Sequence, residues 1–288
     1  MASRQCAGQH VFARRFACSM ALAVVWVVAA CGGGAAVQRP VAVAPAADPR
    51  AAALYLEAVQ QMAAADAESQ ARAVTGFEAA LRADPALWEA QYNLGVLLWR
   101  RGELKKALPH LERAHELADG EREPLVALAE AQHALGRRAE AARLLAEYVE
   151  AHPDAVDVRI ALAAVLRERG AYDEALASVR QALVRDPASL PALLEVGRIY
   201  RVKGDLDVAE VVFEKALALD AKSASTHNDL GLLALARGDT QRAFDEFEKA
   251  TASDARFVPA RLNRASVLLR AGDYAAAQRE YRAVLEVA

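Results

Sequence analysis

The chain has 288 residues, of which 55% are apolar, 6% aromatic and 25% charged, with a formal net charge of −3. Ala, Leu and Val supply most of the apolar content. Such a composition is typical of helix-on-helix packing, because alanine combines the highest helix propensity with a small side chain. The slightly negative charge leaves no basic footprint and excludes a nucleic-acid partner. No segment alternates apolar and polar residues between turn residues as a strand would, so we predict an all-α fold.

The first thirty residues have the layout of a secretory signal peptide. Arg4, Arg14 and Arg15 stand without any Asp or Glu before Cys31, and an uninterrupted apolar run fills positions 21–30. A membrane-spanning helix needs about 20 apolar residues, so this run favours a cleaved signal over the alternative of a spanning anchor. We predict that residues 1–30 are removed.

The end of that run carries a more specific pattern. Val28-Ala29-Ala30-Cys31 resembles the lipobox, at which lipoprotein signal peptidase cuts before an invariant cysteine. The resemblance implies that the Cys31 thiol receives diacylglycerol and that the new amino terminus is acylated. Several acyl chains hold a protein stably at a membrane, whereas a single chain binds only marginally. A plain secreted protein cut after Ala30 is the alternative.

The cysteines and charges of the mature chain agree with a lipid anchor. Cys6 and Cys18 fall in the removed segment, so only Cys31 remains and neither an intramolecular disulfide nor a thiolate metal cluster can form. Without the three arginines of the signal, 32 basic residues face 38 acidic ones, a net charge of −6. An acidic body is not attracted to anionic lipid head groups, so we expect the lipid itself to hold the protein.

Residues 31–50 are rich in Gly, Ala and Pro with almost no charge, and we interpret them as a tether. The triplet Gly32-Gly33-Gly34 is not followed by Gly-Lys-Ser/Thr and is therefore no phosphate-binding loop. Gly32 also replaces the Asp that retains many lipoproteins at the inner membrane. This resemblance implies the outer membrane of a Gram-negative-type bacterium, with the protein facing the periplasm.

Residues 51–288 repeat with a period of 34 residues. A glycine recurs once in each unit, at Gly102, Gly136, Gly170, Gly204, Gly238 and Gly272. An alanine recurs in every unit and a large apolar residue stands four positions after it, at Phe77, Leu111, Leu145, Val179, Phe213, Phe247 and Tyr281. A strict period over so many units predicts a repeat architecture.

Each unit has the pattern of a helical hairpin. Apolar residues spaced by three and four predict a first helix, and the glycine ends it with a left-handed cap at low cost. A second helix follows and stops at pairs such as Asp84-Pro85 and Asp186-Pro187, because proline cannot continue a helix. One hairpin cannot bury its own apolar face, so the units are expected to stack.

These columns resemble the tetratricopeptide repeat, whose pattern is W-x2-L-G-x2-Y, then A-x3-F, then P. The unit that starts at 190 fits best, with Val196-Gly197, Tyr200, Ala209 and Phe213. The family's leading Trp is absent throughout. The resemblance implies a right-handed α-solenoid of seven repeats, with unit starts near 54, 88, 122, 156, 190, 224 and 258.

Three features depart from a regular array. The first unit has Gln60-Gln61 where the others have the Leu-Gly-like pair, so we expect a degenerate repeat there. Pro109 falls inside a second helix, which we expect it to kink. The last unit has no capping helix after it in this sequence, which ends at Ala288.

In the family, the first helices line a concave groove, and the resemblance places defined positions of each unit in it. The residues so assigned are Tyr92, Val96, Trp99, Val126, Ile160, Arg167, Leu194, Arg198, Arg201, Asn228, Leu232, Leu235 and Leu262. Lys and Asn, with which some relatives capture a C-terminal carboxylate, are mostly missing from this set. An apolar groove with three arginines instead favours an apolar or amphipathic partner segment that carries an acidic residue. The alternative is that several of these side chains are core.

Catalysis is not indicated. His110, His115 and His133 lie in the repeats and Glu130 precedes His133 by three residues, but no third converging ligand and no catalytic motif accompanies them. We therefore predict no enzyme activity, no metal, no cofactor and no small-molecule substrate. Lipid-anchored proteins of this kind resemble pilotins of type IV pili and components of gliding-motility complexes. A regulator or adaptor of cell-wall synthesis is the alternative.

Overall fold

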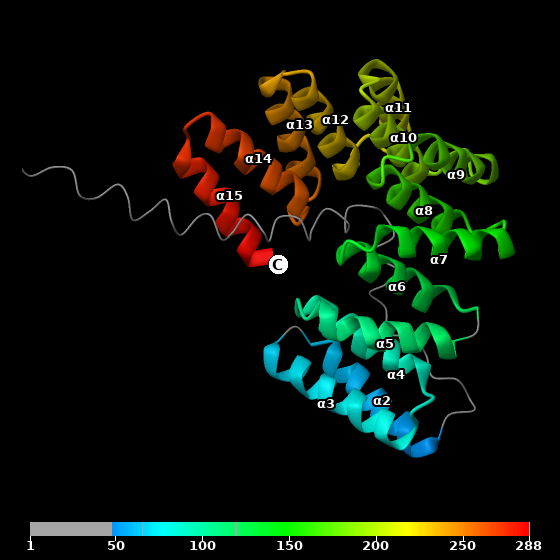
Figure 1. The fold of residues 1–288 in the computed structure, drawn as a ribbon. Helices are drawn as coiled ribbons and strands as arrows, with labels where there is room; N and C mark the ends of the chain where they lie inside the picture. The colour runs from blue at the N-terminus through cyan, green and yellow to red at the C-terminus, as the bar shows by residue number, and fades with distance from the viewer. Residues whose placement is uncertain (1–47, 65, 119, 288) are drawn as a thin grey trace, which may run out of the picture.

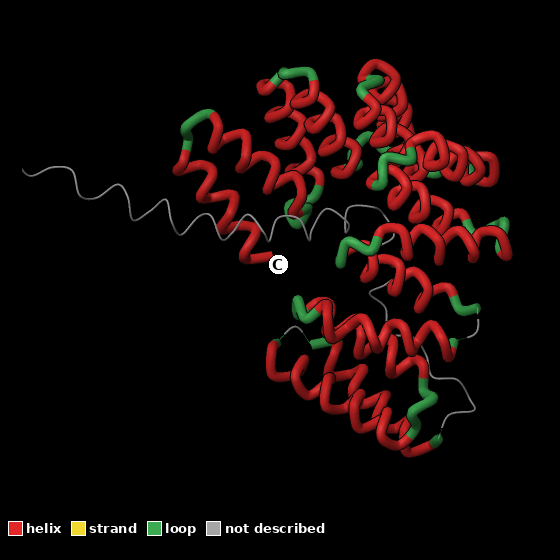
Figure 2. The backbone as a smooth tube through the Cα atoms, viewed as in Figure 1, coloured by secondary structure: helices red, strands yellow, loops and turns green. Residues whose placement is uncertain are grey.

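The computed structural model describes residues 48–64, 66–118 and 120–287, and every regular element within them is an α-helix (Figures 1 and 2). The helices of the first three units are α2 (Pro49–Met62), α3 (Ala67–Ala83), α4 (Trp88–Arg100), α5 (Leu104–Leu117), α6 (Arg122–Ala134) and α7 (Arg138–Ala151). Those of the remaining units are α8 (Val156–Glu168), α9 (Tyr172–Arg185), α10 (Leu190–Lys203), α11 (Leu206–Leu219), α12 (Ala224–Ala236), α13 (Thr240–Ser253), α14 (Val258–Arg270) and α15 (Tyr274–Val287).

Consecutive helices pair into hairpins, and the hairpins stack side by side in chain order. Figure 1 shows them following a curve, with α6, α8 and α10 toward its inside and α7, α9 and α11 toward its outside. The predicted all-α solenoid is therefore confirmed.

None of the described helices is long and apolar enough to cross a membrane. The predicted signal peptide, the lipobox with Cys31 and most of the tether lie outside the described residues.

Six of the seven predicted unit starts coincide with the first residue of a helix, namely Trp88, Arg122, Val156, Leu190, Ala224 and Val258. The first unit differs, because α2 begins at Pro49 and not at 54. The carboxylate of Asp48 accepts hydrogen bonds from the backbone N–H groups of Arg50 and Ala51, and Pro49 stands at the first turn. A side chain that accepts hydrogen bonds at the N-cap, followed by proline, favours the start of a helix. This pair therefore starts α2 earlier than the 34-residue period predicts.

The recurring glycines end the first helices as predicted. Gly102 has φ +78°, its N–H donates to the carbonyl of Trp99, and the N–H of Glu103 donates to the carbonyl of Leu98. These two bonds form a Schellman motif, which satisfies carbonyls that a helix end leaves without partners. The same pair of bonds recurs at the other five glycines of the column. Each hairpin therefore turns in the same way.

Small residues on the first helices allow the second helix of the same unit to approach closely. A Cβ on Gly95 would lie 2.7 Å from the side chain of Leu111, and one on Gly197 or Gly231 would overlap the ring of Phe213 or Phe247. Real Cβ atoms do not come so close, so only glycine fits at these contacts. Pro109 lies inside the second helix of its unit as expected, since α5 runs from Leu104 to Leu117, and the kink there stays a prediction.

Candidate partner-binding face

The first helices of successive units contact one another along the whole array. We call the surface that they form, on α4, α6, α8, α10, α12 and α14, the inner face. All the residues assigned to the groove from the sequence lie on these six helices. Their burial divides them into two groups.

The first group belongs to the core, so these residues correct the groove assignment. A partner cannot reach side chains that neighbouring helices cover, which bears out the alternative for this part of the set. The residues buried in this way are Tyr92, Val96, Val126, Leu194, Arg198 and Asn228.

The second group keeps part of its side chain accessible. Apart from two arginines, these residues are apolar, and the accessible apolar ones on α12 and α14 lie on adjacent helices. The partly exposed residues are Trp99, Ile160, Arg167, Arg201, Leu232, Leu235 and Leu262. This group, and not the full set, is the surface of the inner face that a partner can touch.

The expected cationic patch is largely neutralised by the chain's own acids. Arg167 Nε lies 2.6 Å from Glu195 Oε1, and Arg198 Nε lies 2.8 Å from Asp229 Oδ2. A second contact joins Arg198 Nη1 to Glu195 Oε2 at 3.7 Å. Both carboxylates are buried, with 1% and 2% of Glu195 and Asp229 exposed. Two of the three arginines are thus engaged in ion pairs that link α8, α10 and α12.

Glu195 and Asp229 were not singled out in the sequence, although a signal exists for them. They are 34 residues apart, at the same place in their units, where two earlier units have Ala127 and Ala161. A carboxylate at a place that alanine occupies elsewhere is costly to bury unless a cation pairs with it. Acids that replace a small apolar residue in a repeat column therefore point to buried ion pairs.

Other junctions between first helices carry neutral or His-containing links in place of Arg–carboxylate pairs. Asn93 Nδ2 on α4 donates to Tyr55 Oη on α2 at 2.5 Å, and Asn263 Nδ2 on α14 donates to Asn228 Oδ1 on α12 at 2.8 Å. These bonds cross the same kind of junction as the arginine pairs. Buried polar links of this kind fix how one unit sits on the next, because each has a single partner that satisfies it.

Arg201 differs from its two neighbours. No hydrogen bond or ion pair of its side chain is found within the described residues, and its Nε is buried without a partner. Burial lowers the pKa of the Arg201 guanidinium from its ordinary value, and Arg167 and Arg198 act in the same direction, whereas the charges of Asp229 and Glu195 act in the opposite one. An arginine nonetheless stays charged at neutral pH, so this side chain is a cation without an ion pair of its own among the described residues.

Glu130 on α6 is the acidic counterpart of Arg201. It has no hydrogen bond or ion pair among the described residues, and burial raises the pKa of its carboxyl to about 7. Burial disfavours the charged form of a carboxyl that has no cationic partner, so the group takes up a proton at a higher pH than usual. The inner face therefore holds a partly neutral acid on α6 and a cation on α10.

The histidines have structural neighbours. His133 Nε2 lies 2.7 Å from Glu168 Oε2, which ties α6 to α8, and His110 Nδ1 lies 2.7 Å from Gln91 Oε1. Within the part of the chain that the structure describes, no three His, Cys, Asp or Glu side chains converge to hold a metal ion.

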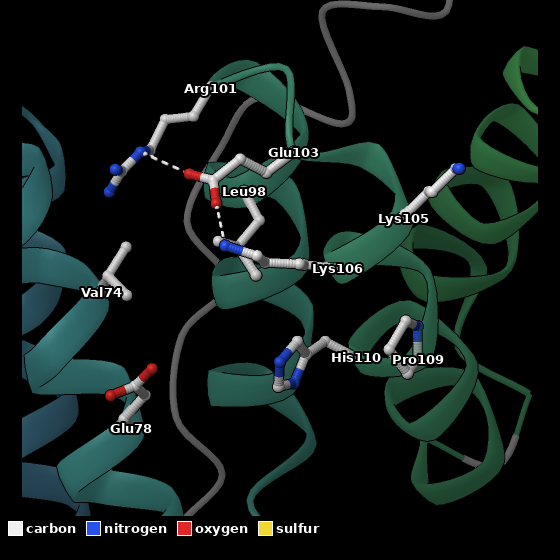
Figure 3. A pocket seen from close by; sticks show the side chains of 9 residues that line it. All are labelled: Val74, Glu78, Leu98, Arg101, Glu103, Lys105, Lys106, Pro109 and His110. Atoms are coloured by element: carbon white, nitrogen blue, oxygen red, sulfur yellow. Dashed lines mark hydrogen bonds and ion pairs between the residues drawn. The ribbon is translucent and has the colours of Figure 1, made fainter.

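A hollow of about 590 Å³ lies on the outer side, between α3 and α5, and was not foreseen from the sequence. Figure 3 shows Val74 and Glu78 on one wall and His110 on the other. Glu103 lies 3.1 Å from Arg101 Nε and 2.7 Å from Lys106 Nζ, so it pairs with two of the cations at the rim. The hollow offers no convergent set of unpaired groups to hold a ligand.

The fold and the inner face place the chain in the class of solenoids built from stacked helical hairpins. Comparison with models of known protein families identifies its family. Models of the tetratricopeptide repeat family match residues 62–121, 98–165, 159–191, 194–256 and 258–283. The chain belongs to the tetratricopeptide repeat family. No curated protein sequence matches it.

Solved structures share the fold. A tetratricopeptide repeat protein from Parabacteroides merdae is 18% identical with a TM-score of 0.66, over 82% of this chain and 93% of that one. A thermophilic member from Thermus thermophilus is 26% identical with a TM-score of 0.56, over 63% and 99%. PilW, a widely conserved type IV pilus biogenesis factor, is 19% identical with a TM-score of 0.59, over 72% and 94%. Proteins of this family serve as scaffolds that bind other proteins, which is the coarse function that the repeats support.

Proposed function

We propose that this protein is a lipid-anchored scaffold or assembly factor for a machine of the bacterial envelope. Two features support the proposal. The repeats build an elongated surface whose inner face keeps apolar side chains accessible, and the lipobox with Cys31 supplies an anchor ahead of it. Residues 31–48, the part of the predicted tether that precedes α2, space the solenoid from the membrane. The outer membrane, with the repeats in the periplasm, is the proposed location.

The observation that carries the binding role is the accessible apolar surface at Leu232, Leu235 and Leu262 on α12 and α14. Accessible apolar side chains that are grouped on one face mark interaction sites in soluble domains. Helical segments dock in such places through apolar residues spaced at three and four. The partner is therefore an apolar or amphipathic protein segment.

For the machine we propose the type IV pilus and its secretin channel, or a gliding-motility complex. The fold of PilW shows that a solenoid of this kind serves in a type IV pilus biogenesis factor, and for this chain the role remains a proposal. The alternative is an adaptor or regulator of cell-wall synthesis enzymes, which the same surface and anchor would suit.

Site-directed photo-crosslinking in the native bacterium separates these roles. A benzoylphenylalanine at Leu235 samples the inner face, and one at Val211, which is 65% exposed on α11, is the matched outer control. We expect Leu235 to crosslink a secretin, pilus or motility component and Val211 to leave it unlabelled. Crosslinks to peptidoglycan enzymes would establish the alternative role, and crosslinks from Val211 alone would refute the inner face.

The anchor is tested separately. A Cys31→Ser variant is expected to lose metabolic fatty-acid labelling and to leave the membrane fraction, because no other cysteine of the mature chain can be acylated. A variant that remains labelled would refute the lipobox. Substitution of Gly32 serves as the control for a general effect on export.

A further inference from the structure

One cation at the centre of the inner face has no ion pair of its own among the described residues. Three guanidinium groups, those of Arg167, Arg198 and Arg201, lie on α8 and α10, and the two buried carboxylates next to them pair with the first two. Glu195 accepts from Arg167 at 2.6 Å, and Asp229 accepts from Arg198 at 2.8 Å. Arg201 pairs with neither carboxylate, and its Nε is buried without a hydrogen-bond partner.

The next carboxylate along α8 does not supply the missing charge. Glu168 Oε2 lies 2.7 Å from His133 Nε2 and 3.6 Å from Arg138 Nε, and its other oxygen faces Arg167 at 3.9 Å. Its pKa is lowered, first by the hydrogen bond from His133. Glu168 is therefore engaged by His133, Arg138 and Arg167, and not by Arg201.

An unpaired cation in such a place weakens the fold. Withdrawing a guanidinium from water costs free energy that a direct partner offsets best, and here Asp229 and Glu195 act on Arg201 without an ion pair while Arg167 and Arg198 repel it. Arg201 Nε is buried without a hydrogen-bond partner, while part of the side chain stays accessible. Charged groups that destabilise the free protein in this way are found at binding sites, where the ligand supplies the missing ion-pair partner.

Partly accessible apolar side chains lie on α12, the helix that packs against the helix of Arg201. Arg201 lies one helical turn beyond Arg198 on α10, and Leu232 lies one turn beyond Asp229 on α12, so both follow the buried pair along their helices. Leu232 and Leu235 are only partly covered. A cation bordered by apolar surface matches a segment in which an acidic residue is flanked by apolar ones.

We infer that Arg201 anchors one Asp or Glu carboxylate of a partner protein, whose flanking apolar side chains rest on Leu232 and Leu235. This inference rests on the proposed function and specifies the partner's chemistry. A single guanidinium without an ion pair matches a monoanion, whereas a phosphate dianion would require a second unengaged cation. A planar guanidinium also donates two parallel hydrogen bonds to a carboxylate.

The stability of the free, full-length protein tests whether Arg201 is uncompensated. Arg201→Leu is expected to raise the midpoint of thermal unfolding in detergent, because it removes a buried charge that has no partner. Arg198→Leu, the matched control on the same helix, is expected to lower the midpoint because it strands Asp229. A lowered midpoint for Arg201→Leu as well would show an internal role and overturn the inference.

The role of Arg201 in binding is tested by selecting displayed random twelve-residue peptides for binding to the full-length protein. We expect the selected peptides to combine apolar residues with Asp or Glu, and selection on Arg201→Gln to retain the apolar residues alone. For one synthetic peptide, exchange of the acid for its amide should lower affinity about tenfold, in line with the strength of a charge-assisted hydrogen bond. The same exchange should have no effect on binding to Arg201→Gln.

The outcomes are distinguishable. Arg201→Lys should keep part of the acid preference, since it keeps the charge. Peptides that are apolar but show no acid preference on the wild-type protein would overturn the role of Arg201 and leave the binding face intact. If no peptide is enriched and Leu232→Glu leaves crosslinking from the inner face unchanged, both the inference and the proposed binding face fail.

Discussion

The inner face changes character along the array. Among the repeat positions assigned to a groove, Tyr92, Val96 and Val126 on α4 and α6 are buried, whereas Leu232 and Leu262, at matching positions on α12 and α14, stay partly accessible. The apolar core is a single continuous cluster from α2 to α10 and divides into two smaller clusters beyond it. The same place in a repeat can thus be core or surface, depending on how completely the neighbouring units cover it.

The largest effect is expected from truncating the buried part of the face. Tyr92→Ala should lower the free energy of unfolding by about 3–5 kcal/mol, because it leaves a cavity in the continuous core. Leu262→Ala, at the same repeat position on α14, should cost about 1 kcal/mol, since that side chain is already partly in water. Urea denaturation followed by circular dichroism measures both. Equal costs would contradict the division of the inner face.

Breaking the buried ion pairs comes next. Glu195→Ala should lower the free energy of unfolding by about 3 kcal/mol, because it leaves both Arg167 and Arg198 without this carboxylate in a buried site. Asn263→Ala, which removes the neutral link from α14 to Asn228, should cost about 1 kcal/mol. A denaturant series on the two variants makes the comparison. A smaller loss for Glu195→Ala would mean that water reaches the arginines.

A pH-dependent effect is expected at α6. The folded-state pKa of Glu130 is raised to about 7, so the folded protein binds more protons than the unfolded chain between the ordinary carboxyl pKa and 7. Stability contributed at Glu130 is therefore present at acid pH and lost as pH rises toward 7. Glu130→Gln should stabilise the protein by about 2 kcal/mol at pH 8 and by much less at pH 5. A gain that does not vary with pH would contradict this assignment.

The smallest effect on stability is expected at the most accessible end. Leu269, at the groove position after Leu262 and Ser266 on α14, is 41% exposed, so Leu269→Ser should change the free energy of unfolding by less than about 0.5 kcal/mol. If α14 belongs to the binding surface, the same change should lower crosslinking from Leu235. Thermal unfolding and crosslinking yield on the one variant separate folding from binding. A large loss of stability would place Leu269 in the core.

Much of the fold follows from local sequence signals. The glycine column, the Asp-Pro pairs and the alternation of small and large residues predict where helices end and how closely they approach, because each acts through its immediate neighbours. Unit starts from 88 onward were predicted correctly for this reason. The first unit escaped prediction because Asp48 and Pro49 start α2 outside the 34-residue register.

The sequence by itself determined the repeat, the family and the candidate anchor at Cys31, because these depend on the identity and spacing of residues. Only the tertiary structure decided which inner-face residues are accessible, since burial depends on side chains that lie about one repeat away. It also decided which arginines are engaged. Arg167, Arg198 and Arg201 look equivalent in the sequence, but Glu195 and Asp229 reach only the first two. The binding face foreseen as a run of apolar residues with three arginines is, in the folded chain, a smaller surface on which Arg201 alone of the three has no ion pair among the described residues.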